Sequence, residues 1–286
     1  PMWGVGALLL LYILLVGPIN YLVLRWRRRL EWAWGTIPAL TILFAAGVYG
    51  LGLATRGGER SLTTASVVRM ASGGPVALAD HYAGLLSPRR QNYTLSAGPG
   101  ALFSLPNYAG RRRGGPGGGI EHLAVSQENP PLVRDFRVEQ WSIRPFLVRT
   151  ILEQPPAIQL QVERQGSQAG VRLVNGSGAA LRDCMLLGRR EYAMLGEVPA
   201  GTTLSRTPAL DSSQDAFHAA LYSTDPRFHE TLISLFAYDL FNNGPEELLL
   251  ACLADGPAVS FDVEGDRVRQ QGWTVYLISP DRTQAP

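Results

Sequence analysis

The chain has 286 residues, of which 46% are hydrophobic and 17% are charged, and its formal net charge is +2 at pH 7. The charged fraction is below the ~25% that is usual for soluble domains, and the first 54 residues account for much of the deficit. A net charge this small argues against the basic stripe of a nucleic-acid-binding domain, so we expect no nucleic-acid partner.

Two long uncharged runs open the chain. The first covers residues 2–24, where Asn20 is the only strongly polar residue, and the second covers 33–54. Because a membrane span needs about 20 apolar residues, we predict a transmembrane helical hairpin over 1–54, with helices at 2–24 and 34–54. A buried soluble hairpin fits this length poorly. A cleaved signal peptide would carry its positive charge before the apolar run, and here the charge follows it.

The connection between the runs, residues 25–33, carries the residues that predict topology and depth. They are the arginines Arg25, Arg27, Arg28 and Arg29 and the tryptophans Trp26, Trp32 and Trp34. Short arginine-rich loops stay in the cytoplasm, and tryptophan prefers the membrane–water interface. We therefore predict a bacterial inner-membrane protein with two spans, whose N-terminus and C-terminal domain are extracytoplasmic.

Gly17 and Pro18 interrupt the first run. Proline removes one backbone hydrogen bond from a helix, so these two residues predict a kink. We favour a kink packed on the second helix over an ion or substrate site. Neither run contains an ionisable residue, and transport sites inside membranes usually do.

The pattern changes to β after the hairpin. Short segments rich in Val, Leu, Phe and Tyr alternate with turn residues at 66–72, 76–87, 92–97, 133–152 and 157–188. The segment 133–152 predicts one strand with a bulge, and Asn175-Gly176 predicts a hairpin turn. Roughly seven such strands with regular turns predict an antiparallel β-sandwich-like extracytoplasmic domain over 55–210.

The remaining residues, 211–286, predict a small α-helical insert followed by closing strands. Two helices are expected at 211–223 and 225–243, and Asp225 is placed to cap the second with Pro226 in its first turn. Strands return at 247–254, 258–263 and 273–279. The predicted fold class is therefore a membrane-anchored, mainly β protein.

We find no motif for catalysis, metal binding or cofactor binding. The four histidines have no metal-ligand spacing, and there is no GxSxG or CxxC sequence. Buried thiols are favoured over a bridge for Cys184 and Cys252. The tract 109–122 holds Arg111, Arg112 and Arg113, which could contact an anionic lipid or glycan, although a solvated glycine-rich loop is the favoured interpretation.

The motifs GPINYLVLR (17–25), WGTIPA (34–39) and GVYGLG (47–52) resemble a family of uncharacterised bacterial membrane proteins. In that family a hairpin of this kind precedes a β-rich outer domain, which here would include RLVNGSG (172–178) and LGEVPAG (195–201). The resemblance implies the fold and carries no activity and no catalytic residue. Such proteins often look like the C-terminal part of a longer chain, which fits a sequence that begins with Pro1. All 26 basic residues are arginine, which suggests a bacterial source.

We therefore predict a non-enzymatic module that is anchored in the membrane and binds or scaffolds another envelope component. Its partners would be the lipid bilayer and an envelope or membrane protein, with no cofactor and with any small-molecule ligand unknown. Two alternatives stay open. One is an envelope hydrolase acting on carbohydrate or peptide, which would need paired carboxylates in a pocket. The other is an accessory subunit of a membrane transporter.

Overall fold

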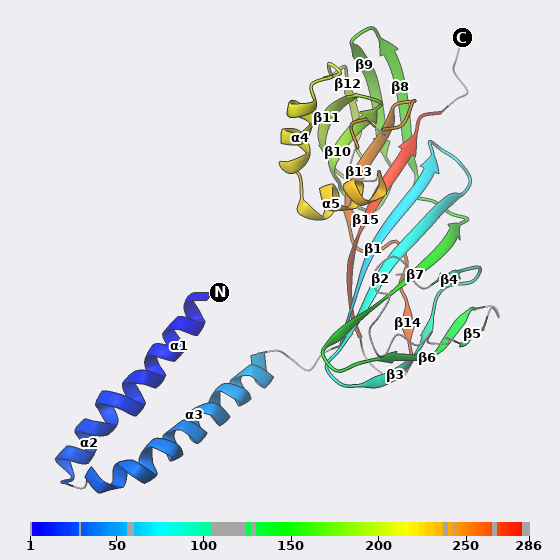
Figure 1. Cartoon of the computed structure of the whole chain (residues 1–286). Coiled ribbons are helices and arrows are strands. Elements are labelled where there is room, and N and C mark those ends of the chain that lie inside the picture. The colour runs from blue at the N-terminus through cyan, green and yellow to red at the C-terminus, as the bar shows by residue number, and fades with distance from the viewer. Residues whose placement is uncertain are drawn as a thin grey trace. The chain divides into compact units, whose positions relative to one another are not determined.

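The computed structural model describes residues 2–28, 30–55, 60–104, 124–126, 130–236, 240–242, 244–264 and 268–281. The chain divides into two compact units, Pro1–Gly58 and Glu59–Pro286, each of which is described by itself. The first is helical. The second, which we call the outer domain, is mainly β with several sheets (Figure 1).

The helical unit is an antiparallel pair of apolar helices. The first consists of α1 (Met2–Leu14), a π-helical turn η1 (Leu15–Ile19) and α2 (Asn20–Trp26). A short 3₁₀ turn, η2 (Leu30–Trp32), leads into α3 (Ala33–Thr55). Among the described residues, two helical segments, Gly6–Trp26 and Ala33–Gly50, are long and apolar enough to cross a membrane. Length and composition alone support that statement.

The outer domain is built on one long mixed sheet. Within the described residues its strand order is β11 (Glu191–Val198), β10 (Leu181–Gly188), β13 (Leu249–Asp255), β15 (Val268–Ser279), β1 (Arg60–Ala71), β2 (Ala77–Ser87), β7 (Ser142–Leu152) and β4 (Leu102–Ser104). Side chains alternate between the two faces of each strand, so the long sheet has an inner and an outer face.

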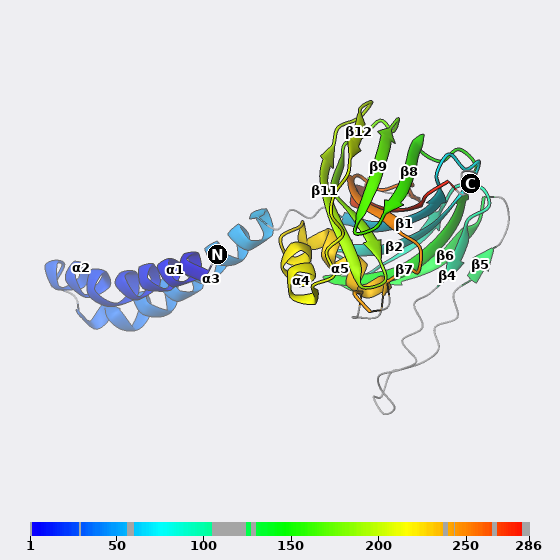
Figure 2. The same cartoon turned by 90° about the horizontal axis from the view of Figure 1, so that it is seen from above.

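Two smaller sheets cover the inner face. One has the order β12 (Thr203–Arg206), β9 (Gln168–Asn175), β8 (Ile158–Gln165), and the other β14 (Asp262–Val263), β3 (Gln91–Ser96), β6 (Leu132–Val138), β5 (Ala124–Ser126). The first packs on one half of the long sheet through residues such as Leu160, Leu173 and Val68. The second packs on the other half through Tyr93, Phe136 and Val148. Figure 2 shows β8, β9 and β12 lying opposite β1, β2 and β7.

Two short helices, α4 (Gln214–Tyr222) and α5 (Pro226–Leu235), cover part of the outer face. Phe217, Phe228 and Leu232 pack on β10, β13 and β15 in a third hydrophobic cluster. Asp225 caps α5 by accepting the Arg227 backbone N–H at 2.9 Å, with Pro226 in the first turn, as the sequence predicted. α5 ends at Leu235, well before the predicted limit of 243, and residues 237–239 lie outside the described part of the chain.

The structure corrects three local predictions. Pairing is not antiparallel throughout, because β1 and β15 are parallel neighbours, from Arg60 opposite Val268 to Ala71 opposite Ser279. The segment 133–152 is not one bulged strand, because β6 and β7 belong to different sheets. Asn175-Gly176 does not close a hairpin, because β9 and β10 are also in different sheets.

The Asn175 side chain explains the third difference. It is fully buried, and its amide nitrogen donates to the carbonyl oxygens of Ala179, Val198 and Pro199 at 2.9–3.1 Å. Its side-chain oxygen accepts the Ser177 N–H at 3.1 Å. Asn175 therefore holds the chain where it passes from one sheet to another, and these backbone partners satisfy a buried amide that would otherwise destabilise the fold.

Candidate functional site

The outer face of β2, β7 and β4 carries a group of exposed apolar side chains that no helix covers among the described residues. Leu78 lies opposite Ile151 and Tyr82 opposite Leu147 in the β2–β7 register, and Leu102 of β4 is on the same face. Leu78, Tyr82, Leu102 and Ile151 are all exposed. We call this surface the open face. Single exposed apolar residues are ordinary, whereas several on neighbouring strands make this face a candidate interaction surface.

An ion triad lies at the centre of the open face. The Asp80 carboxylate is almost fully buried, and it accepts hydrogen bonds from Arg69 Nη1 at 2.5 Å and from Arg149 Nε at 2.7 Å. Burial alone would raise the pKa of Asp80, but the hydrogen bonds from Arg149 and Arg69 outweigh it and hold the pKa below its ordinary value. Two half-exposed guanidinium groups thus share one carboxylate, which leaves one positive charge in the middle of an apolar surface.

His81 lies on the inner face, directly after Asp80 in β2. Its ring is fully buried between Ser66 Oγ, 2.9 Å from Nδ1, and Thr150 Oγ1, 2.9 Å from Nε2. Ser66 Oγ also accepts the backbone N–H of Ala258 at 3.3 Å. Burial lowers the pKa of His81 to about 4, so the ring is neutral at pH 7. The hydroxyl groups lie away from the surface, and His81 acts as a hydrogen-bonded link between β1, β2 and β7.

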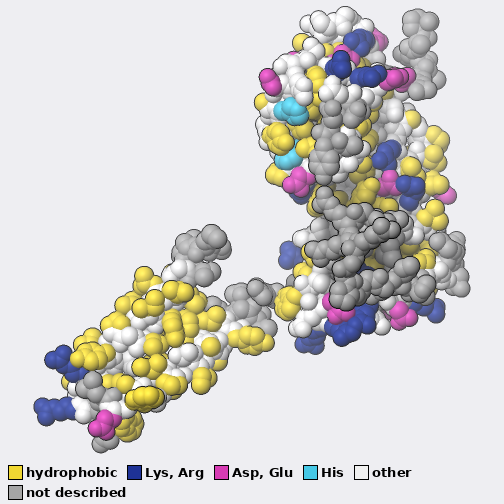
Figure 3. All heavy atoms as spheres, viewed as in Figure 1, with side chains coloured by type: hydrophobic (Ala, Val, Ile, Leu, Met, Phe, Trp, Pro, Cys, Tyr) yellow, Lys and Arg dark blue, Asp and Glu magenta, His cyan; other side chains and the backbone are white. Residues whose placement is uncertain are grey.

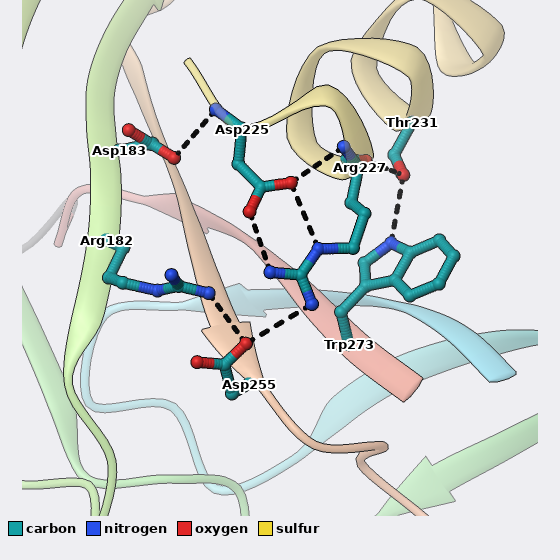
Figure 4. Close-up of polar contacts among 7 residues, drawn as sticks. All are labelled: Arg182, Asp183, Asp225, Arg227, Thr231, Asp255 and Trp273. Carbon is teal, nitrogen blue, oxygen red and sulfur yellow. Dashed lines mark hydrogen bonds and ion pairs between the residues drawn. The ribbon is translucent and has the colours of Figure 1, made fainter. Parts of the chain in front are cut away.

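A second charged cluster fixes α5 to the long sheet (Figure 4). Arg227 donates to both oxygens of Asp225, at 3.0 and 2.7 Å, and to Asp255 Oδ1 at 3.3 Å. Arg182 of β10 donates to the same Asp255 oxygen at 2.6 Å. The hydrogen bond from Arg227 lowers the pKa of Asp225 to about 2. The Asp225 N–H also donates to Asp183 at 3.1 Å, so these carboxylates hold a helix end in place.

The predicted topology residues lie around the turn of the helical unit. Arg25 and Trp26 close α2, and Trp26, Trp32 and Trp34 are exposed. Arg27 and Arg28 follow α2, with Arg28 at a φ of 52°, and Arg29 is outside the described residues. Gly17 and Pro18 lie inside the π-helical turn η1, a geometry that arises where the regular hydrogen-bond ladder is interrupted.

Polar contacts join the two apolar helices. The Asn20 amide donates to Thr36 Oγ1 at 3.2 Å, and the Tyr12 and Thr41 hydroxyls are also 3.2 Å apart. Beside them is an apolar groove of about 330 Å³, whose lining includes Leu11, Tyr12, Phe44 and Gly47. Asn20, the strongly polar residue of the first apolar run, therefore contacts the second helix.

The remaining candidate residues do not form a reactive centre in the described part of the chain. No group of three or more His, Cys, Asp or Glu residues described there could hold a metal ion. Cys184 and Cys252 are fully buried free thiols, and burial raises the pKa of Cys252. A cleft of about 490 Å³ includes Glu247 and Asp281, but both already have interaction partners. Arg111, Arg112 and Arg113 lie outside the described residues.

Sequence reasoning missed the ion triad of the open face. Arg69, Asp80 and Arg149 are separated by 11 and 69 positions along the chain, and only the pairing of β1, β2 and β7 brings them together. The available signal was weak: Asp80 is the single acidic residue in a mainly apolar strand segment, and a buried carboxylate requires a cationic partner.

No family model and no curated protein matches the chain. Among solved structures, it is similar to the yeast delta-COP-I mu-homology domain, with a TM-score of 0.41 and 7% identity over 77% of this chain and 98% of that chain. For the same domain complexed with a Dsl1 WxWxV peptide, the TM-score is 0.40 and the identity is 7%, over 77% of this chain and 98% of that chain. For an M1 zinc metallopeptidase from Deinococcus radiodurans, the TM-score is 0.26 and the identity is 8%, over 52% of this chain and 40% of that chain.

Proposed function

We propose that this protein is a membrane-anchored module whose outer domain binds another protein of the bacterial envelope and has no catalytic activity of its own. The helical hairpin would hold the chain in the inner membrane, with both termini on the extracytoplasmic side. The two apolar segments, Gly6–Trp26 and Ala33–Gly50, support the anchor by their length and composition.

The open face is the observation that carries the binding proposal. Its exposed apolar side chains come from neighbouring strands, so they form one surface on a rigid sheet. The Asp80 triad fixes the two guanidinium groups at its centre, where they retain further N–H donors. Apolar contact area around a few fixed polar groups is the usual composition of a protein-binding surface, in which arginine and tyrosine are frequent.

Site-specific photocrosslinking in the producing cells tests this function. The photoreactive amino acid p-benzoylphenylalanine replaces Tyr82 on the open face or, as a matched control, Tyr222 on α4; the two tyrosines are 48% and 62% exposed. We expect one discrete crosslinked product from position 82 and none of that size from position 222.

Charge introduced into the open face provides the second arm of this test. Leu78→Arg with Ile151→Arg places two cations at opposed register positions, so it should abolish the product formed from position 82. The protein-binding proposal is wrong if positions 82 and 222 give the same products, or if the product from position 82 survives the two added arginines.

A transporter accessory subunit is a second candidate, and the groove in the helical hairpin favours it. The groove is lined by apolar residues and by Gly47, at which a Cβ atom would meet nothing within 4 Å. Small residues let helices approach closely inside a membrane, so a third helix would fit beside Gly47. This candidate differs from the first in using the hairpin, and not the open face, for partner binding.

A further inference from the structure

One end of the outer domain combines basic and aromatic side chains. Strand pairing brings residues 60–61, 87–91 and 137–144 to this end: Ser61 lies opposite Leu86, Ser87 opposite Ser142, and Gln91 opposite Val138. We call these residues the strand-end surface. Figure 3 shows arginine side chains gathered at this lower end of the outer domain, where β1 and β7 begin.

The strand-end surface is basic. Arg60 and Arg144 already donate hydrogen bonds, to Tyr93 and Gln91 and to the Arg137 carbonyl, and the other charged residues are Arg89, Arg90 and Arg137 with Glu139. Glu139 contacts Arg137 at 3.0 Å and Arg90 at 3.4 Å, and both of these arginine side chains remain accessible to solvent. The single charge of Glu139 cannot neutralise Arg89, Arg90 and Arg137 together, so this part of the surface favours anionic ligands.

Two apolar side chains stand among these arginines. Trp141 and Ile143 are both exposed, in the bend between β6 and β7 and at the start of β7. Trp141 has a φ of 55°, which is unusual for a bulky residue, and its N–H donates to the Ser87 carbonyl at 2.8 Å. An exposed tryptophan beside arginines is the composition of surfaces that bind at a membrane–water interface.

The covalent chain limits how far this surface can lie from a membrane that contains α3. Four residues, 56–59, separate the end of α3 at Thr55 from the start of β1 at Arg60. Even fully extended, this connection spans no more than about 18 Å. Arg60 belongs to the strand-end surface, so membrane insertion of α3 would keep this surface close to the lipid headgroups.

We infer that the strand-end surface binds the anionic headgroups of the bilayer in which α3 is embedded. This inference rests on the proposed membrane anchor. The arginines would contact phosphate groups, and Trp141 and Ile143 would enter the interfacial layer. The outer domain would then be held against the membrane, which leaves the open face, on other residues of the same sheet, to bind a protein partner.

Fluorescence quenching in nanodiscs tests the inference with the full chain. A cysteine at Ile143 is labelled with an environment-sensitive fluorophore, and Ile151→Cys is the matched control. Ile143 and Ile151 lie on the same face of β7 with 67% and 64% exposure, so they differ mainly in position along the strand. Cys184 and Cys252 are fully buried, and the unmodified chain shows whether they react.

The nanodiscs contain phosphatidylcholine alone or with about 30% phosphatidylglycerol, together with a headgroup nitroxide quencher. We expect the label at position 143 to lose about half of its fluorescence in the anionic discs and much less in the neutral discs, because headgroup binding depends on charge. The label at position 151 should stay bright in both. Arg89→Gln with Arg90→Gln should restore the fluorescence at position 143, whereas Arg172→Gln with Arg189→Gln, which removes two exposed arginines elsewhere, should not.

The outcomes separate the inference from the anchor. A chain that does not enter nanodiscs contradicts the proposed membrane anchor itself. A chain that enters nanodiscs but shows no quenching at position 143 leaves the anchor intact and overturns headgroup binding. Equal quenching in neutral and anionic discs also overturns it, because the arginines would then have no role in the contact.

Discussion

His81 illustrates, at the scale of single residues, how a polar group is accommodated in this β domain. Its ring lies on the inner face of the long sheet, between the hydroxyl groups of Ser66 and Thr150. A neutral imidazole offers one donor and one acceptor, and a hydroxyl group can serve as either, so both ring nitrogens are satisfied. Protonation would convert the acceptor nitrogen into a second donor and place a charge in the core.

We predict that His81 makes the outer domain sensitive to mild acid. The pKa falls from 6.5 in the unfolded chain to about 4 in the folded domain, so the unfolded state binds more protons between these values. The contribution of neutral His81 to the free energy of unfolding is complete above pH 6.5. It is lost as the pH falls toward 4, by about 3 kcal/mol in total. Denaturant unfolding at a series of pH values measures this slope.

His81→Gln provides the control for this prediction, since glutamine keeps a donor and an acceptor and does not titrate. The deciding quantity is the slope of the unfolding free energy between pH 4 and 6.5, and not its absolute value, because the substitution also changes packing in the core. The same slope in both proteins would show that another group binds the protons. The contribution of Asp80 to the pH dependence of stability can be told apart from that of His81, because the pKa of Asp80 is lowered from 3.8 and its contribution is lost at lower pH.

Residues with local partners were predictable from the sequence, and residues with distant partners were not. Asp225 and Pro226 form a cap within one helical turn, so their spacing was sufficient to predict it. Asp80 and Arg149 lie 69 positions apart, and their contact depends on the register of β2 and β7. A one-residue shift in register would move Asp80 to the other face of its strand, so the triad required the structure.

The same distinction holds for whole elements. The segments expected at 76–87 and 92–97 correspond to β2 and β3, because alternation is a local property. The partners of each strand are a global property: β1 and β15 pair in parallel, although they are at opposite ends of the domain sequence. The Asn175-Gly176 signal marked the end of a strand correctly, but the predicted hairpin was wrong, because the two strands that flank it join different sheets.

Gly272 allows the parallel pairing of β15 with β1, and we predict that Gly272→Ala destabilises the outer domain. It lies opposite Thr64, and an added Cβ atom would overlap the Thr64 carbonyl oxygen, which is backbone and cannot rotate away. The expected loss in unfolding free energy is about 1–3 kcal/mol, which is typical of overpacking. The midpoint of denaturant unfolding measures it.

Gly178→Ala is the matched control for Gly272→Ala. A Cβ atom at Gly178 meets nothing within 4 Å, and its φ is outside the left-handed region, so the variant should unfold within a few tenths of a kcal/mol of the parent. If Gly272→Ala were as stable as Gly178→Ala, the strands would have to be further apart than this structure places them.

At the scale of the whole molecule, the change in composition near residue 55 was the clearest signal in the sequence. Two long uncharged helical runs precede it and alternating β segments follow it, and the boundary between the two compact units falls between Gly58 and Glu59. The helices and the β class were therefore predictable. The open face could not be predicted from the sequence. Which part of the sheet stays uncovered depends on where α4 and α5 pack, and their position is set by the third hydrophobic cluster of the domain.

The orientation of the chain in a membrane is the last prediction. Arg25, Arg27 and Arg28 lie at the turn between the two apolar helices, and the positive-inside rule places such a turn in the cytoplasm. Both exposed test positions, Glu31 in the turn and Tyr222 on α4, accept a cysteine without disturbing a core. Cys184 and Cys252 are buried and should add little background.

A membrane-impermeant maleimide that reaches the outer surface of the inner membrane should therefore label Tyr222→Cys in intact cells. It should label Glu31→Cys only after that membrane is permeabilised, because the membrane potential, which is negative inside, and the anionic lipids of the inner leaflet both favour the arginines on the cytoplasmic side. The opposite pattern would invert the topology and place the open face in the cytoplasm. Labelling of both positions in intact cells would mean that the two apolar helices do not span the membrane, which would remove the basis for both the anchor and the headgroup contact.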